Sequence, residues 1–243
     1  MIREPRPVLL PLGTGAGATT VFDGDASTSF AILLGSECRL LVDLGVGVAR
    51  QALRFLQAIP DNVYISHNHS DHAGELPVVA VRRAKEGRPL TIWSEPEVAW
   101  RLREHRLHEF REAGLLPDDL ARWGATPENV ETAVDSDFSL VTHRGVHSET
   151  SFGFVLRFRG QPVLGYSADS AFSPELYAHL LAAPVLVLDG RSTGSSDHAS
   201  FADIASFARG APASKKIFVT HYGRPDEAPV DLDHLRPGEP LAI

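Results

Sequence analysis

The stretch VYISHNHSDHAGEL, residues 63–76, places three histidines and one aspartate within six positions, directly after a short apolar run. These four residues are His67, His69, Asp71 and His72. Positions 67, 69 and 71 alternate along the chain, so an extended backbone would direct these side chains to the same side. Imidazole and carboxylate groups are strong ligands for divalent metal ions. The stretch therefore indicates a metal site at the end of a strand rather than a solvated polar loop.

The composition limits both the ligands and the substrates. Cys38 is the one cysteine among 243 residues, so neither an intrachain disulfide nor a cysteine-rich zinc site can form. Any metal must therefore be held by histidine and carboxylate. Acidic residues outnumber basic ones by 31 to 23, which gives a net charge of −8. Proteins that bind long nucleic acids usually carry a basic surface, so a small-molecule substrate is favoured and a long nucleic acid is disfavoured.

The sequence gives no sign of a leader or a membrane segment. Residues 1–13 contain an apolar run of five residues, which is too short for a signal peptide. No other run approaches the roughly 18 apolar residues of a transmembrane helix. A cytoplasmic protein without a membrane partner is therefore expected.

Short apolar runs bounded by glycine or aspartate predict a strand-rich fold. The predicted strands span residues 8–12, 29–34, 38–45, 62–66, 89–93, 138–148, 151–158, 162–170, 184–190 and 215–223. The predicted helices span residues 47–58, 75–86, 95–114, 174–182 and 200–209. Helices do not alternate strictly with strands, and no repeat or linker divides the chain. The pattern predicts a single domain, residues 1–243, of α/β (α+β) class with two helix-covered sheets rather than one doubly wound sheet.

The H-x-H-x-D-H signature resembles that of the metallo-β-lactamase-fold hydrolases. Four other segments are similar to motifs of the same family, and they extend the resemblance over nearly the whole chain. These segments are LLVDLG (40–45), VHSETSFGF (146–154), GYSADS (165–170) and KKIFVTHYG (215–223). The resemblance implies a four-layer αββα sandwich of two mixed β-sheets flanked by helices. In this arrangement Asp43 would be the acidic residue ahead of the signature.

The same resemblance implies a ligand set for two divalent metal ions. One ion would be held by three histidines, namely His67, His69 and His147. The other would be held by one carboxylate and two histidines, namely Asp71, His72 and His221. Asp169 would bridge the two ions. Zinc is the expected metal, with manganese or iron as alternatives, because all three accept histidine and carboxylate ligands.

One further segment narrows the resemblance to a subgroup. SSDHASFADIASFA (195–208) resembles a motif of ribonuclease Z-like members, and it places His198 at the catalytic histidine of that family. Members that process tRNA insert a long arm between the third histidine and the bridging aspartate. Here that gap is 169 − 147 = 22 residues, which is enough for a hairpin alone. The chain is therefore similar to compact phosphodiesterases, which act on cyclic nucleotides or small phosphodiesters. Ribonuclease Z-like relatives are commonly dimers, so the resemblance also implies a homodimer.

The predicted function is a dinuclear metal-dependent hydrolase, and a phosphodiesterase with a small substrate is favoured. Two divalent ions can share one water, lower its pKa and neutralise the oxygens of a phosphodiester. Asp71 is expected to orient the hydroxide so formed, and His198 to protonate the leaving alkoxide as general acid. Asp189 or Asp197 could accept the other N–H of His198.

The sequence leaves three other functions open. The same site could hydrolyse a lactone, ester or thioester, the protein could process the 3′ ends of tRNA, or it could be a non-catalytic metal-binding accessory protein. His143 competes with His147 for the ligand role, but the spacing to SFGF favours His147, and His143 is expected at the surface. His105 and His108 are expected to be solvated. The glycine-rich GTGAG (13–17) is expected to form a tight connection, with a backbone turn that approaches the substrate phosphate as the alternative.

Overall fold

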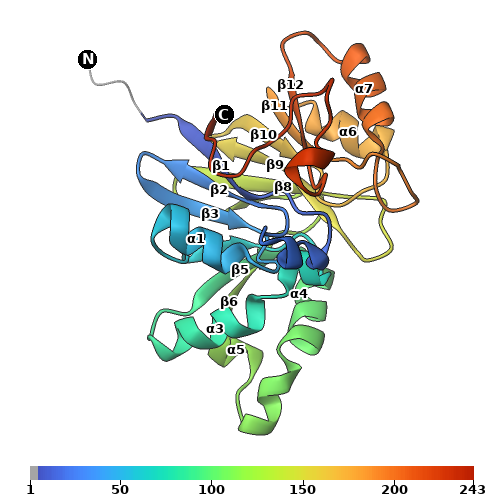
Figure 1. The fold of residues 1–243 in the computed structure, drawn as a ribbon. Coiled ribbons are helices and arrows are strands. Elements are labelled where there is room, and N and C mark those ends of the chain that lie inside the picture. Colours follow the sequence, from blue (N-terminus) through green and yellow to red (C-terminus); the bar gives the residue numbers. More distant parts are fainter. Residues whose placement is uncertain (1–4) are drawn as a thin grey trace.

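Two mixed β-sheets form the centre of the molecule, and helices cover the outer face of each (Figure 1). The computed structural model describes residues 5–243, apart from the side chains of residues 19 and 21. The first sheet has seven strands, in the order β13 (Leu241–Ala242), β1 (Pro7–Gly13), β2 (Ser29–Leu34), β3 (Glu37–Val42), β4 (Asn62–Tyr64), β5 (Leu90–Ser94) and β6 (Ala121–Ala125). The second has six, in the order β12 (Lys216–Thr220), β11 (Val185–Asp189), β10 (Gln161–Tyr166), β9 (Phe152–Phe158), β8 (Phe138–Arg144) and β7 (Glu131–Ala133). The predicted four-layer αββα sandwich is confirmed.

Each sheet changes from antiparallel to parallel pairing across its width. In the first sheet β1, β2 and β3 pair antiparallel, whereas β3 to β6 pair parallel. In the second sheet β7 to β10 pair antiparallel, whereas β10, β11 and β12 pair parallel. Because parallel strands end at the same edge of a sheet, the loops that follow them lie close together.

The sheets pack against each other through an apolar interior. Along β2, Phe30 and Ile32 face the other sheet, whereas Ala31 faces the helices. This alternation follows from the two-residue period of a strand. The ring of Phe30 meets that of Tyr166 edge-on, with the ring centres 5.0 Å apart, so aromatic packing joins the two sheets.

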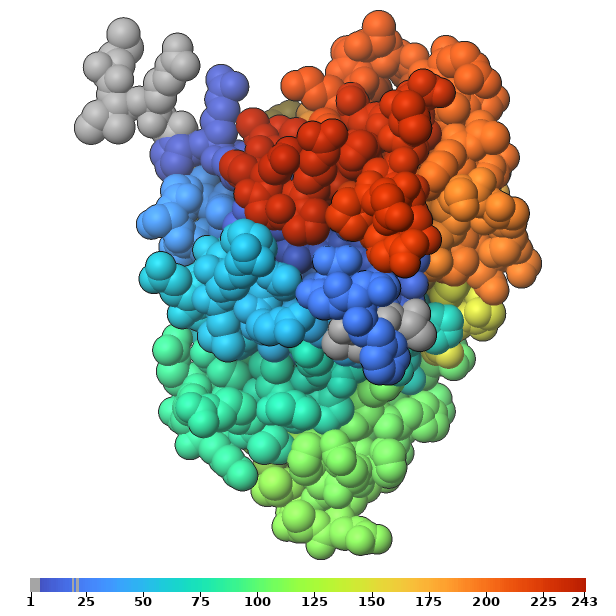
Figure 2. All heavy atoms as spheres, viewed as in Figure 1, coloured from blue at the N-terminus to red at the C-terminus, as the bar shows by residue number. Residues whose placement is uncertain are grey.

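The outer layers are helices with one apolar face. The first sheet is covered by α1 (Val48–Leu56), α3 (Leu76–Lys85) and α5 (Pro117–Leu120), and the second by α6 (Pro174–Leu180) and α7 (Phe201–Gly210). Figure 2 shows the C-terminal residues, in red, lying over the N-terminal ones, in blue, in agreement with the pairing of β13 with β1. Among residues 5–243, no helix has the length and apolar character needed to cross a membrane.

The segment predicted as one helix, residues 95–114, is three shorter elements. These are α4 (Pro96–Arg101), a π-helix, η2 (Leu102–Arg106), and a 3-10 helix, η3 (His108–Ala113). The buried residues of this segment are Val98, Leu102 and Leu107, spaced by four and then five positions. The N–H of Leu107 donates to the carbonyl oxygen of Leu102 at 3.2 Å, and this wider turn keeps Leu107 on the core side. The prediction of one regular helix was therefore wrong.

Several predicted strands end earlier than expected. Sheet pairing stops at Val42 in β3, at Arg144 in β8, at Tyr166 in β10 and at Thr220 in β12. The polar residues that follow these strands leave the sheet instead of continuing it. Seven short elements were not predicted, because runs this short show little periodic pattern. They are η1 (Ala18–Asp23), α2 (Ser70–Ala73), η4 (Pro225–Glu227), α5, β6, β7 and β13.

Candidate metal centre

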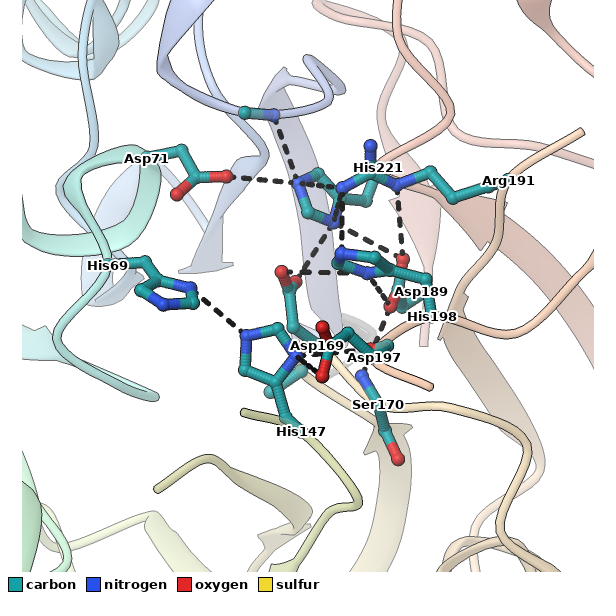
Figure 3. Close-up of polar contacts among 12 residues, drawn as sticks. His69, Asp71, His147, Asp169, Ser170, Asp189, Arg191, Asp197, His198 and His221 are labelled. Atoms are coloured by element: carbon teal, nitrogen blue, oxygen red, sulfur yellow. Dashed lines mark hydrogen bonds and ion pairs between the residues drawn. The ribbon is translucent and has the colours of Figure 1, made fainter. Parts of the chain in front are cut away.

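Loops and the short helix α2 at one edge of the two sheets bring together all seven residues predicted to bind metal. Residues 67–72 follow β4, His147 follows β8, Asp169 follows β10 and His221 follows β12. Figure 3 shows side chains from these separate segments converging on one space. They form two clusters that Asp169 connects.

The first cluster consists of His67, His69 and His147, with one ring nitrogen of each within 4.8 Å of the others. Nε2 of His147 lies 3.0 Å from Nδ1 of His69. Nδ1 of His147 donates to the carbonyl oxygen of Asp197 at 3.1 Å, which leaves the lone pair of Nε2 facing the cluster. Burial, followed by the charge of His72, lowers the pKa of His67 well below its usual value. These rings can therefore offer lone pairs to a cation.

The second cluster consists of Asp71, His72, Asp169 and His221, all of them buried. Oδ1 of Asp169 lies 3.1 Å from Nε2 of His72 and 2.9 Å from Nδ1 of His221. Nε2 of His221 lies 3.3 Å from Oδ2 of Asp71. The other oxygen of Asp169 lies 3.9 Å from Nε2 of His67, in the first cluster. Asp169 thus lies between the two clusters, as a bridging carboxylate must.

The second cluster has the electrostatics of a cation site. Burial acts to raise the pKa of Asp71, but His72 and His221 outweigh it and hold this pKa below its usual range. Burial acts to lower the pKa of His72, but the carboxylates of Asp169, Asp43 and Asp71 raise it well above 6.5. For His221, burial is likewise outweighed, chiefly by Asp169, and its pKa rises to about 10. The carboxylates therefore stay ionised and attract positive charge to this space.

Within the described part of the chain, three buried polar atoms at the clusters make no hydrogen bond of acceptable geometry: Nε2 of His67, Nε2 of His72 and Oδ1 of Asp169. The last two lie 3.1 Å apart as an ion pair without hydrogen-bond geometry. An unpaired buried polar atom is costly, so such atoms call for an explanation. Nδ1 of His67 is 3.0 Å from the hydroxyl of Ser66, and Nδ1 of His72 is 2.8 Å from Asp43, so both unpaired nitrogens are the ones left for a ligand. The donor set fits divalent metal ions, which would take these lone pairs.

Asp43 holds His72 in place from behind the cluster. It is fully buried, and its Oδ2 accepts hydrogen bonds from Nδ1 of His72 at 2.8 Å, the hydroxyl of Ser66 at 2.9 Å and the hydroxyl of Tyr166 at 3.2 Å. Its Oδ1 accepts from the backbone N–H of Ser66 at 2.8 Å. A carboxylate that accepts the Nδ1 proton fixes the histidine tautomer in which Nε2 carries the lone pair.

The backbone at the site is strained. Asp43, Ala168 and His221 have φ angles of 62°, 51° and 61°, in the left-handed region that non-glycine residues rarely adopt. Such conformations cost about 1–3 kcal/mol each and persist where the surroundings hold them. Ala168 turns the chain immediately before Asp169, so this strained residue helps to orient a candidate ligand. Strain concentrated in this way is typical of functional sites.

His198 lies beside the second cluster, in the loop between β11 and α7. Its Nδ1 donates to Oδ2 of Asp189, the last residue of β11, at 2.8 Å. Of the two carboxylates predicted to orient His198, Asp189 makes this contact, whereas Asp197 contacts His147 through its carbonyl oxygen. The same ring nitrogen of His198 lies 3.8 Å from Asp169, so the imidazole is adjacent to the candidate bridging residue.

Two further residues reach the site without having been predicted. Nη2 of Arg191 lies 3.3 Å from Nε2 of His198 and 3.2 Å from Nε2 of His221 (Figure 3). The N–H of Gly17 donates to Nε2 of His221 at 3.3 Å. Arg191 and His198 also line an adjacent cavity of about 520 Å³. The only sequence signal for Arg191 is its position directly after Asp189 and Gly190, where β11 ends. A basic residue at such a position does not by itself indicate a functional site.

The remaining histidine predictions have mixed outcomes. His143 takes no part in either cluster. The prediction that it lies at the surface was wrong, because its side chain is only 7 % exposed. Its Nδ1 lies 2.8 Å from Oδ1 of Asn129, and its ring stacks on that of His179 with the ring centres 4.0 Å apart. Packing of α6 against β8 explains this burial. His105 and His108 are exposed, as predicted.

The GTGAG segment is the tight connection that was predicted. A Cβ atom on Gly15 would lie 2.6 Å from the carbonyl oxygen of Ala26, so this position has no room for a side chain. The contact between Gly17 and His221 adds a direct link between this connection and the second cluster.

Comparison with solved structures supports the fold. The crystal structure of the metallo-β-lactamase fold protein YhfI from Bacillus subtilis aligns over 97 % of this chain and 99 % of that chain, with a TM-score of 0.75 and 17 % sequence identity. At this identity the likeness shows the fold alone. The predicted metallo-β-lactamase fold is confirmed.

Comparison with curated proteins and family models shows the family. The chain is 28 % identical over 232 residues to the anti-Pycsar protein Apyc1 of Bacillus phage vB_BveM-Goe7, with 88 % of each protein covered. It is 27 % identical over 244 residues to the protein of the same name from Paenibacillus harenae, with 94 % of this chain and 95 % of that protein covered. The family model described as anti-Pycsar protein Apyc1 matches residues 8–233. Because this match spans almost the whole chain, the protein belongs to the anti-Pycsar Apyc1 family of metallo-β-lactamase-fold proteins.

Proposed function

We propose that this protein is a dinuclear metal-dependent phosphodiesterase that hydrolyses a small substrate, either a cyclic nucleotide or another small phosphodiester. The observation that carries the proposal is the convergence of seven histidine and aspartate side chains, with unpaired lone pairs on His67, His72 and Asp169 inside the site. Membership of the anti-Pycsar family supports a cyclic nucleotide as substrate.

The ligand roles follow the two clusters. The first cluster would hold one ion. Asp71, His72 and His221 of the second cluster would hold the other ion, and Asp169 would contact both ions. Zinc is proposed, although manganese and iron would suit the same donors. When bound, the ions would activate a water and neutralise charge on the phosphoryl oxygens.

The residues around the ions have roles of their own. Asp71 has one oxygen near His221 and would orient the attacking oxygen through its carboxylate. His198 is held through Nδ1 by Asp189, so its Nε2 is the atom that would pass a proton to the leaving alkoxide. The imidazole is partly exposed and lines the 520 Å³ cavity, where a leaving group could lie.

The size of the cavity supports a small substrate. Its volume lies within the roughly 300–1,000 Å³ typical of small-molecule sites. Residues 147–169, where an arm for tRNA would be inserted, form only β9, β10 and their connections. The homodimer and the cytoplasmic location expected from the sequence remain predictions.

The test uses the full chain, depleted of metal and reloaded with zinc or manganese. The panel contains bis(4-nitrophenyl) phosphate, 3′,5′-cyclic nucleotides, a lactone, a thioester and a precursor tRNA. Hydrolysis of the diesters is expected and should be lost with chelator. The matched control is His105→Gln, which changes an exposed histidine and should behave as wild type. Hydrolysis of the lactone or thioester alone would refute the phosphodiesterase proposal, and no hydrolysis with full metal loading would indicate an accessory protein.

A further inference from the structure

We propose that Arg191 binds the anionic phosphoryl group of the substrate, and that its charge allows this metal centre to accept an anion. The inference rests on the proposed phosphodiesterase function and adds a substrate-binding residue to it. It follows from where the guanidinium lies, which contacts it lacks and what charge surrounds it.

The backbone of Arg191 is fixed on both sides. Its N–H donates to the carbonyl oxygen of Ala199 at 2.9 Å, and its own carbonyl oxygen accepts from the N–H of Phe201 at 2.8 Å. From this anchored position the side chain extends over His198 and His221 (Figure 3). The guanidinium therefore lies between the proposed proton donor and the second cluster, at the wall of the 520 Å³ cavity.

The guanidinium is poorly matched by protein groups. Its Nε is buried and has no hydrogen-bond partner among the described residues. Oδ1 of Asp189 is 3.9 Å from that nitrogen, beyond hydrogen-bond reach, and it lies closer to Nδ1 of His221, at 3.2 Å. Among the described residues, Nη2 contacts imidazole nitrogens of His198 and His221. His221 would give its lone pair to a metal ion, and a protonated His198 has no lone pair to accept from a guanidinium. A guanidinium carries five N–H donors in a planar fork that matches two oxygens of a phosphate.

A charge count explains why a cation is needed here. Four buried carboxylates at the site, those of Asp43, Asp71, Asp169 and Asp189, would balance two divalent ions. A hydroxide nucleophile and the protonated imidazole of His198, the proposed general acid, would then cancel each other's charges. Arg191 gives the centre a net charge of +1, which matches the single negative charge of a phosphodiester, because a guanidinium stays protonated in proteins. A neutral ester carries no charge to match it, so Arg191 favours an anionic substrate.

Arg122 offers a matched control outside the site. It is an exposed arginine on β6, at the edge of the first sheet, and it is not among the residues that line the 520 Å³ cavity. Replacing it removes one arginine from the protein while the charge at the site stays the same.

The experiment measures kinetics and direct binding on the metal-loaded protein. The variants are Arg191→Gln, Arg191→Lys and the control Arg122→Gln. For Arg191→Gln we expect KM for bis(4-nitrophenyl) phosphate to rise about 10- to 100-fold, the range expected for a lost hydrogen bond to a charged group, with kcat within about threefold. The Kd for inorganic phosphate, measured by calorimetry, should weaken by a similar factor, while metal content and Tm stay unchanged. Arg122→Gln should match wild type in all five quantities.

The outcomes separate this inference from the proposed function. Unchanged phosphate affinity in Arg191→Gln, or a loss confined to kcat, would overturn the role of Arg191. If Arg191→Gln does not fold, Arg191→Lys provides the test. A single ammonium group then replaces the planar guanidinium and should weaken phosphate binding two- to tenfold. Unchanged phosphate affinity in this variant would overturn the direct contact. If the wild type hydrolyses no diester, the proposed function fails alone, since phosphate binding still tests whether Arg191 holds an anion.

Discussion

Replacing Asp43 with asparagine should weaken metal binding at the second cluster without changing any of the seven candidate ligands. The carboxylate of Asp43 is fully buried and accepts four hydrogen bonds, three of them on Oδ2. An asparagine that keeps its oxygen toward the N–H of Ser66 must turn its NH₂ group toward Nδ1 of His72. The hydroxyls of Ser66 and Tyr166 can rotate to accept from that group, but an imidazole N–H cannot.

The proton of His72 would then move from Nδ1 to Nε2, the atom that faces the site. Loss of a charge-assisted buried hydrogen bond corresponds to about 1.5–3 kcal/mol, and loss of such a supporting carboxylate typically weakens metal affinity about 10- to 100-fold. We expect this loss for one of the two ions. The other ion, held by the first cluster, should lose less affinity, because Asp43 reaches His67 only through the hydroxyl of Ser66.

Competition with a chromophoric zinc chelator measures both affinities, and circular dichroism verifies that the variant is folded. The control is Asp118→Asn, which replaces an exposed carboxylate paired with Arg103 at 2.8 Å, outside both clusters. A variant that binds both ions as tightly as wild type would refute the role assigned to Asp43. Weakening confined to the ion of the first cluster would also refute it, because His72 is the candidate ligand that Asp43 contacts directly.

Three other predictions concern the remaining parts of the site and one buried histidine. His198→Ala should lower kcat for a cyclic nucleotide about 10²- to 10⁴-fold. It should lower kcat much less for a 4-nitrophenyl diester, because that leaving group needs no proton. Equal losses for the two substrates would exclude His198 as the general acid. Arg106→Gln removes contacts to the side chain of Asn68 at 2.7 Å and to the hydroxyl of Ser70 at 3.2 Å. Urea unfolding should therefore show that the free energy of unfolding falls by about 1 kcal/mol. An unchanged midpoint would mean that Arg106 does not support residues 67–72. Burial, followed by the charge of His179, lowers the pKa of His143 from 6.5 to about 4. The unfolded chain therefore binds this proton first, and wild-type stability should fall as the pH drops from about 6.5 to about 4, whereas His143→Gln should show a flatter pH profile in the same urea titrations.

The fold could be predicted because the signals were local and repeated. Strands such as β2 alternate between residues that face the other sheet and residues that face the helices, and each candidate ligand follows an apolar run. The resemblance to a known family supplied the grouping of residues 67–72 with His147, Asp169 and His221, which no local pattern could give. Their convergence depends on chain turns such as those at Ala168 and His221, whose left-handed backbone has no sequence signature.

The rest depended on packing between distant segments. His143 is adjacent to the buried Thr142 on β8, so strand alternation favours exposure, and α6 buries it only in the folded protein. The π turn at Leu102 results from the need to bury Leu107, which the sequence alone does not distinguish from a regular helix. Arg191 reaches the site because β11 and β12 end together, and its position in the sequence gives no indication of that.

A crystal structure of the zinc-loaded protein, with anomalous scattering measured at the zinc edge, tests the central claim most directly. We predict two anomalous peaks about 3.5–4 Å apart, one among His67, His69 and His147 and the other among Asp71, His72 and His221, with Asp169 between them. A single peak, or zinc bound away from these two clusters, would contradict the account.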